Sequence, residues 1–202
     1  AARGGSPAPD PGPVASPVPS AALTTAEPPP AVTMARIGRL DLRLPISRSQ
    51  VTAILFHPTA APDAVPLTPV DGVDHQLAQP DGRPGPRTAG VDVGAPAHAL
   101  VYAPVDGVVT AVMPYKVLGK PAGLEIAITP TALTDVAVRV AHIEPTADGL
   151  KPEVGQAVGA GRTVLGRVRD FTGVAEQELA KYTSDVGNHV SVEVVRLASP
   201  EP

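Results

Sequence analysis

The second half of the chain alternates apolar and polar residues in short runs. The clearest run is "GNHVSVEVVR", residues 187–196, in which His189, Ser191 and Glu193 fall on one face and valines on the other. Because successive side chains of a β-strand point to opposite faces, this pattern predicts a strand with an apolar inner face and a polar outer face. Similar runs predict further strands at 101–112, 123–128, 136–143 and 162–168.

Three other segments complete the predicted elements. Residues 33–60 contain "RIGRLDLRL" and "QVTAILFHP", which predict N-terminal strands in a hairpin or at a sheet edge. Residues 61–87 are dense in Pro, Gly and Asp and predict a long loop. Residues 171–182 place apolar side chains at helical spacing and predict one short helix. The predicted fold class is all-β, a sandwich or barrel with a core at 88–197.

The first 32 residues have a different composition from the rest. They are rich in Pro, Ala and Ser without strand or helix periodicity, which predicts an extended tether that does not fold by itself. The folded domain is therefore expected to cover residues 33–202. The chain opens with Ala1, so we expect an exported protein whose signal peptide has been removed, with Met34 as an alternative start.

Charge and composition exclude several classes of function. The formal net charge of −4 and the pI near 5.7 argue against nucleic acid and anionic lipid as partners, which select clustered Lys and Arg. There is no apolar run of about 18 residues, so no transmembrane segment is expected. The absence of cysteine excludes disulfides, thiolate metal sites and a cysteine nucleophile. The sequence does not indicate an oligomeric state.

Three pieces of the core, taken in order, resemble a known family. They are "TAGVDVGAPAHALVYAPVDGVV" (88–109), "VRVAHIEP" (138–145) with "VGQAVGAGRTVLG" (154–166), and "GNHVSVEV" (187–194). Together they resemble the lysostaphin/LytM-type zinc murein endopeptidases, peptidase family M23. The resemblance implies a β-sandwich with duplicated hairpins, a groove over the sheet, and cleavage of peptidoglycan peptides. It also implies a zinc ion held by an H-x-x-x-D motif and by the second histidine of an H-x-H motif.

Only part of the family's site is kept in this sequence. The motif aspartate falls on Asp92, but its histidine falls on Thr88. The family's assisting histidines fall on His142 and His189, whereas the second histidine of H-x-H, a zinc ligand, falls on Ser191. A catalytic zinc needs three protein ligands, and a lone Asp92 is a vestigial one. The resemblance therefore implies an inactive member without zinc or another cofactor, with a groove formed by Thr88, Asp92 and Ser191.

Two enzymatic alternatives stay open. An active zinc endopeptidase would need substitute ligands, for which the loop histidines are candidates: His57, His75 and His98. A serine hydrolase would use Ser191 with the neighbouring site residues, although no G-x-S-x-G nucleophile elbow is present.

A third alternative has no catalytic role. The hairpins around 103–112 and 154–166 also resemble biotinyl or lipoyl carrier domains, with Lys116 or Lys120 as the acylated residue. Both lysines are framed by proline and glycine and lack the acidic or methionine neighbours of those carriers, so shared hairpin architecture is the preferred interpretation. The main expectation is a cell-envelope protein that binds a peptidoglycan peptide or regulates a cell-wall hydrolase.

Overall fold

The computed structural model describes residues 31–61, 63–79 and 82–198. The predicted tether, residues 1–32, therefore lies outside the described residues except for its last two. In the described parts the order of elements is β1 (Thr33–Ile37), β2 (Leu40–Arg43), η1 (Arg48–Gln50), β3 (Ile54–His57), β4 (Thr68–Pro69), β5 (Gln76–Leu77), β6 (Gly90–Gly94), β7 (Leu100–Tyr102), β8 (Gly107–Val117), β9 (Lys120–Pro130), β10 (Val136–Glu144), β11 (Ala157–Val158), β12 (Val164–Val168), η2 (Glu178–Lys181) and β13 (His189–Arg196).

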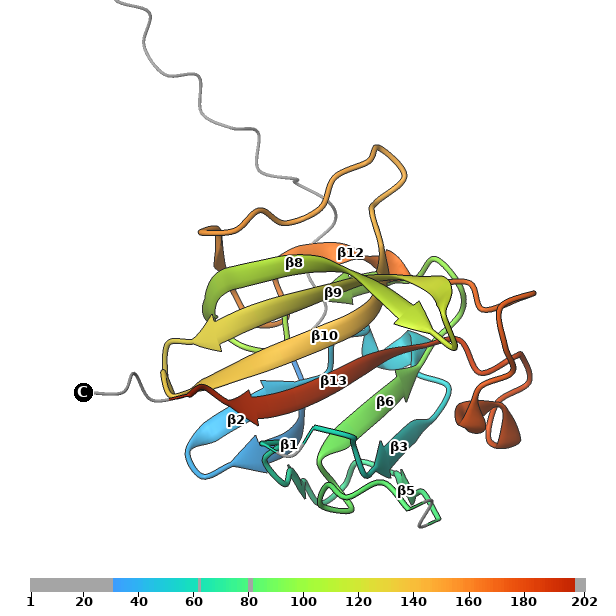
Figure 1. The fold of residues 1–202 in the computed structure, drawn as a ribbon, viewed down its shortest axis with the longest axis horizontal. Coiled ribbons are helices and arrows are strands. Elements are labelled where there is room, and N and C mark those ends of the chain that lie inside the picture. Colours follow the sequence, from blue (N-terminus) through green and yellow to red (C-terminus); the bar gives the residue numbers. More distant parts are fainter. Residues whose placement is uncertain (1–30, 62, 80–81, 199–202) are drawn as a thin grey trace, which may run out of the picture.

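Most strands belong to one large sheet. Its main path runs β11-β8-β9-β10-β13-β6-β3-β5, and β12 joins it by pairing with β10 and with β7. Figure 1 shows β8, β9, β10, β13, β6 and β3 side by side in one curved layer. All pairs on this path are antiparallel except β3 with β5. Strands far apart in the sequence, β6 and β13, thereby become direct neighbours.

A smaller sheet packs against the apolar face of the large one. It has the order β2-β1-β4, and its buried side chains include Met34 and Leu42. They share one hydrophobic cluster with Val91 of β6, Val138 of β10 and Val192 of β13. Because the valines of these strands alternate with polar residues, burying the valine face leaves the polar residues on the opposite face. The apolar pattern of the sequence thus sets which face carries the candidate chemistry.

The predicted all-β class is confirmed by this architecture. The strands expected at 123–128 and 136–143 lie within β9 and β10, and those expected at 162–168 and 187–196 correspond to β12 and β13, each of which begins two residues later than expected. The segment 61–87, predicted to be a long loop, differs in that it contains two short strands. Strand β4 pairs with β1, and β5 runs parallel to β3. Both strands consist of two residues, which is too short for a period-2 pattern to be recognised in the sequence.

The predicted helix at 171–182 is wrong. The structure forms only the 3-10 turn η2 in this segment, Glu178–Lys181. Asp170 accepts a hydrogen bond from the Thr172 amide, and Gly173 has φ of +75°, so the chain turns where the helix would begin. Among the described residues no helix has the length and apolarity needed to cross a membrane.

Candidate functional site

The candidate site is centred on Asp92, in the middle of the β6 segment "GVDVG". Val91 and Val93 are buried in the core, so Asp92 points to the opposite, polar face of the sheet. It pairs directly with Leu55 of β3 on one side and with Ser191 of β13 on the other. Its neighbours on the same face of β6 are Gly90 and Gly94, which have no side chain. Rings from β3 and β13 can therefore approach the Asp92 carboxylate from both sides.

From β3, His57 reaches across to Asp92. His57 pairs with Gly90 and is therefore a diagonal neighbour of Asp92 on the same face. Its Nε2 donates to Asp92 Oδ1 at 3.1 Å, and its Nδ1 lies 2.9 Å from the carbonyl oxygen of Pro58. The ring is almost fully buried, and the Asp92 side chain is 14% exposed. This contact joins residues 35 positions apart in the sequence.

From β13, His189 reaches the same carboxylate. Its Nδ1 donates to the carbonyl oxygen of Gly187 at 2.7 Å, which orients the ring and leaves Nε2 facing Asp92 Oδ1 at 3.5 Å. The ring of Phe171 is stacked on it, with centroids 5.4 Å apart and planes 6° apart. The Phe171 amide donates to Asn188 Oδ1 at 2.8 Å, which ties the segment after β12 to the start of β13. Burial and stacking thus fix His189 in one orientation.

His142 completes a cluster of rings beside Asp92. It lies where the register of β10 against β9 shifts, and its φ of +68° is unusual for a residue with a side chain. Its ring centroid is 4.5 Å from that of His189, 4.9 Å from Phe171 and 5.1 Å from Tyr115. Although His142 is only 6% exposed, neither ring nitrogen has a hydrogen-bond partner among the described residues. Burying an imidazole without a hydrogen-bond partner is energetically costly.

The electrostatics of the cluster depend on the charge of Asp92. Burial by itself would raise the pKa of Asp92, but the charges of His189 and His57 hold it well below its usual range. Burial likewise opposes a charge on His57, yet the Asp92 carboxylate wins and raises the pKa of His57 to about 9. Burial and the charge of His189 lower the pKa of His142 to about 3. At neutral pH the site therefore combines an ionised Asp92, a cationic His57 and a neutral His142.

The donor set does not fit a catalytic zinc ion. Thr88, in the turn before β6, and Ser191 offer neutral hydroxyls, which are poor ligands beside His, Asp, Glu and Cys. The Asp92 carboxylate is already engaged by His57. Among the residues that the structure describes, no group of three or more His, Asp or Glu side chains is arranged to hold a metal ion.

Beyond Asp92 the polar face continues as a mixed surface of acids and one arginine. Arg139 of β10 pairs with Glu193 of β13, and its Nε lies 3.9 Å from Glu125 Oε1 of β9. Glu193 Oε1 is buried without a hydrogen-bond partner among the described residues. Burial raises the pKa of Glu125, and it also raises that of Tyr115. We call this surface, from Asp92 through Ser191 to Glu193, Arg139 and Glu125, the polar face.

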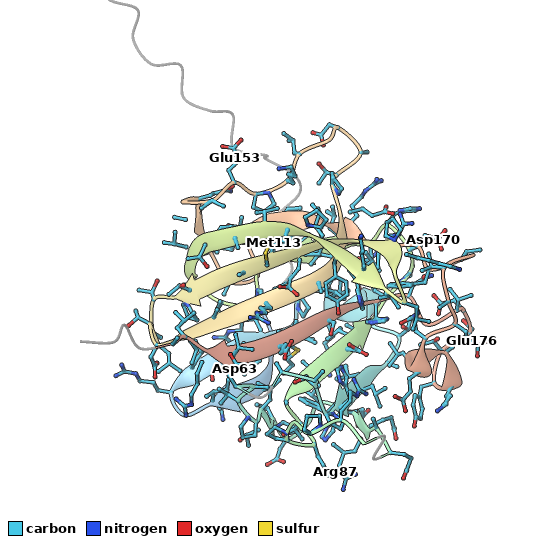
Figure 2. The ribbon with its side chains drawn as sticks, in the orientation of Figure 1. Asp63, Arg87, Met113, Glu153, Asp170 and Glu176 are labelled. Atoms are coloured by element: carbon cyan, nitrogen blue, oxygen red, sulfur yellow. The ribbon has the colours of Figure 1, made fainter. Side chains whose placement is uncertain are left out.

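The structure brings together most of the residues that the sequence singled out. Asp92, His142, His189 and Ser191 lie on the adjacent strands β6, β13 and β10. The Ser191 hydroxyl makes no hydrogen bond with any described histidine, which removes the geometric basis for a serine triad. Figure 2 shows Arg87, the residue before Thr88, at the lower rim of the molecule.

The three loop histidines differ in their positions. His75 packs edge-on against Phe56 and contacts the Val73 carbonyl oxygen. His98 is half exposed and pairs with Glu144 at 3.3 Å. Only His57 reaches Asp92. Sequence reasoning treated His57 as a loop residue and missed Phe171 and Tyr115 altogether. The one available signal for His57 was its place at the end of the apolar run "AILFH", in phase with Leu55.

Comparison with known proteins yields structural neighbours only. No protein-family model and no curated protein matches the chain. The chain is similar to Csd3 of Helicobacter pylori, with 17% identity and a TM-score of 0.40, over 85% of this chain and 33% of that one. It is similar to the M23 metalloprotease pseudoalterin from the deep sea, with 17% identity and a TM-score of 0.41, over 77% and 70%. It is also similar to a zinc-containing peptidase from Vibrio cholerae, with 18% identity and a TM-score of 0.43, over 80% and 43%.

Proposed function

We propose that this chain is a catalytically inactive, peptidoglycan-peptidase-like domain of the cell envelope that binds a cell-wall peptide on its polar face. The observation that carries the proposal is that the Asp92 carboxylate is hydrogen-bonded to His57. By the sequence resemblance Asp92 falls on a zinc-ligand position of the family; in the structure His57 binds this carboxylate, and Ser191 lies opposite it. A site with the family's layout and without its metal can bind a peptide but lacks the activated water that cleaves one.

The polar face has the chemistry that a peptide requires. A peptide presents amide donors and acceptors together with carboxylates or ammonium groups. Arg139 and Tyr115 offer donors. Within the part of the chain that the structure describes, one buried carboxylate oxygen of Glu193 and both ring nitrogens of His142 have no hydrogen-bond partner. Buried polar atoms are normally satisfied, so their concentration on one face supports a bound polar ligand there.

The test measures binding and cleavage separately. Titration of the purified protein with a soluble peptidoglycan stem peptide should give saturable binding, and the peptide should be recovered intact. Glu193→Gln should weaken binding by about tenfold, which is the effect of one charge-assisted hydrogen bond. The matched control is Glu153→Gln, because Glu153 lies away from the polar face in Figure 2 and is exposed. Equal losses in both variants, or no binding by the parent, would contradict the proposal.

One observation favours a second candidate, an active zinc endopeptidase with a substitute ligand. Among the candidate substitute histidines, only His57 lies against Asp92, and His189 is on the other side of the same oxygen. In that case zinc would be retained with His57 as a ligand, and the stem peptide would be cleaved. The effect of removing His57 on zinc affinity separates the two candidates. Zinc binds more weakly if His57 is a ligand and more tightly if His57 competes with the metal.

A further inference from the structure

We propose that His57 is a built-in competitor of the metal: its ring lies over Gly90, holds the Asp92 carboxylate and keeps a divalent cation away from it. This inference rests on the proposed function, since both take the site to be metal-free, but it assigns the exclusion of metal to a specific residue. Relative to the zinc site that the resemblance implies, two differences then act together. Hydroxyls replace histidine ligands at Thr88 and Ser191, and the His57 ring holds the carboxylate that would bind the ion.

The first support is the bonding of the two ring nitrogens of His57. A carboxylate and a carbonyl oxygen can only accept hydrogen bonds, so Nε2 donates to Asp92 Oδ1 at 3.1 Å and Nδ1 donates to the Pro58 oxygen at 2.9 Å. An Arg83 nitrogen, which can only donate, lies farther from Nδ1 at 3.3 Å, so the carbonyl is the partner of Nδ1. A ring nitrogen that donates has no lone pair for a metal. In this arrangement His57 is therefore a competitor and not a ligand.

The second support is the shared oxygen. Both His57 Nε2 and His189 Nε2 face the same Asp92 atom, Oδ1, at 3.1 and 3.5 Å. A zinc ion would have to lie about 2 Å from a carboxylate oxygen. With a ring on each side, the open approach to Oδ1 is reduced, and the Asp92 side chain is only 14% exposed. A cation could reach this oxygen only after His57 moved.

The third support is the room made for the ring at Gly90. A Cβ at this position would lie 2.6 Å from His57 Cε1 and 2.9 Å from Thr59 Cγ2, which is closer than real contacts allow. Any side chain here would therefore push the His57 ring away from its present position. No positive φ is recorded for Gly90, so the obstacles to a side chain here are the His57 ring and, less closely, the Thr59 methyl group. The fit between Gly90 and His57 offers a second way to displace the competitor.

The experiment compares zinc affinity by isothermal titration calorimetry in a background that restores the missing ligands, Thr88→His with Ser191→His. Adding His57→Ala to this background should tighten zinc binding by about tenfold or more, the usual scale for residues that act beside a metal site. Adding His75→Ala instead should leave the affinity unchanged, because His75 packs on Phe56 away from Asp92. Unchanged or weaker zinc binding on removal of His57 would overturn the proposal, and weaker binding would identify His57 as a ligand.

A second variant protects the test against a folding failure. Gly90→Ala in the same restored background keeps His57 but displaces its ring, so it should also tighten zinc binding. Circular dichroism of this variant checks that the fold is retained. Stem-peptide binding by the parent is measured alongside. If the parent binds the stem peptide but the restored variants gain no zinc affinity, only the role of His57 is overturned. If the parent does not bind the peptide but the variants gain zinc affinity as expected, only the proposed function is overturned.

Discussion

Ser191 of β13 stands directly opposite Asp92 of β6 in the antiparallel pairing of the two strands. The pair lies on the polar face because the intervening valines are buried on the other side. A histidine at position 191 would place an imidazole beside the carboxylate, whereas serine leaves a short hydroxyl there. The Asp92 charge is instead balanced by His57 and His189, which approach from the diagonal positions. The site is therefore arranged around charge balance among side chains.

Asp92→Asn should destabilise the fold, although the asparagine side chain has nearly the same shape as that of aspartate. His57 and His189 would lose the carboxylate that compensates their burial, and removing one partner of a buried ion pair typically costs about 3 kcal/mol or more. The free energy of unfolding, from denaturant titration at pH 7, measures the effect. The control is Asp106→Asn, since the Asp106–Arg162 pair is mostly exposed and should contribute less than about 1 kcal/mol. Similar losses in the two variants would contradict a buried charge-balanced site.

Stability should have a maximum near pH 6 to 7. The pKa of His57 is raised from 6.5 to about 9, so its contribution is full below pH 6.5 and is lost as pH rises through 9. The pKa of His142 is lowered from 6.5 to about 3, so its contribution is present above pH 6.5 and is lost as pH falls toward 3. The alkaline loss amounts to at most about 3.5 kcal/mol, at about 1.4 kcal/mol per pKa unit.

Denaturant unfolding at a series of pH values checks this profile. His57→Gln removes the titrating ring and should flatten the curve between pH 7 and 9 while leaving the acid side in place. An alkaline decline of the same size in His57→Gln and in the parent would show that another group is responsible.

Phe171→Ala should disturb both stability and the site. Phe171 is fully buried and stacks on His189, so truncation should cost about 3 to 5 kcal/mol and loosen the ring cluster. Tyr182→Ala, in the same segment but 41% exposed, is the control and should change stability by less than about 1 kcal/mol. Thermal unfolding and stem-peptide affinity are the two measurements. If Phe171→Ala behaves like Tyr182→Ala, the segment after β12 does not anchor the site.

Local periodicity was sufficient for the longer strands and for the β13 part of the site, but not for the two-residue strands β4 and β5. The period-2 pattern of 187–196 fixed the common face of His189, Ser191 and Glu193, because side-chain direction in a strand depends only on position. The helix at 171–182 was wrong because its apolar spacing serves tertiary contacts: Phe171 packs on His189, and Leu179 packs with Leu55 and Ala78. Over one short segment, the same apolar spacing in the sequence is compatible with a helix and with an irregular segment whose apolar side chains pack on different neighbours.

The contact of His57 with Asp92 could not be predicted from local patterns. It depends on β3 pairing with β6 in a register that sets Leu55 opposite Asp92, and on the space left by Gly90. Register between distant strands is a property of the whole sheet. The backbone conformation of His142 also depends on strand register, because its φ of +68° occurs where the pairing of β10 with β9 shifts.

The metal content of the purified protein after dialysis shows whether the Asp92 site holds zinc, and a peptidoglycan cleavage assay shows whether the protein is active. Inductively coupled plasma mass spectrometry measures the first. A site whose carboxylate is held by His57, with only hydroxyls at Thr88 and Ser191, should retain far less than one equivalent of zinc and release no peptide fragments. One equivalent of zinc retained against a mild chelator, together with cleavage, would contradict the claim and make this chain an active metallopeptidase.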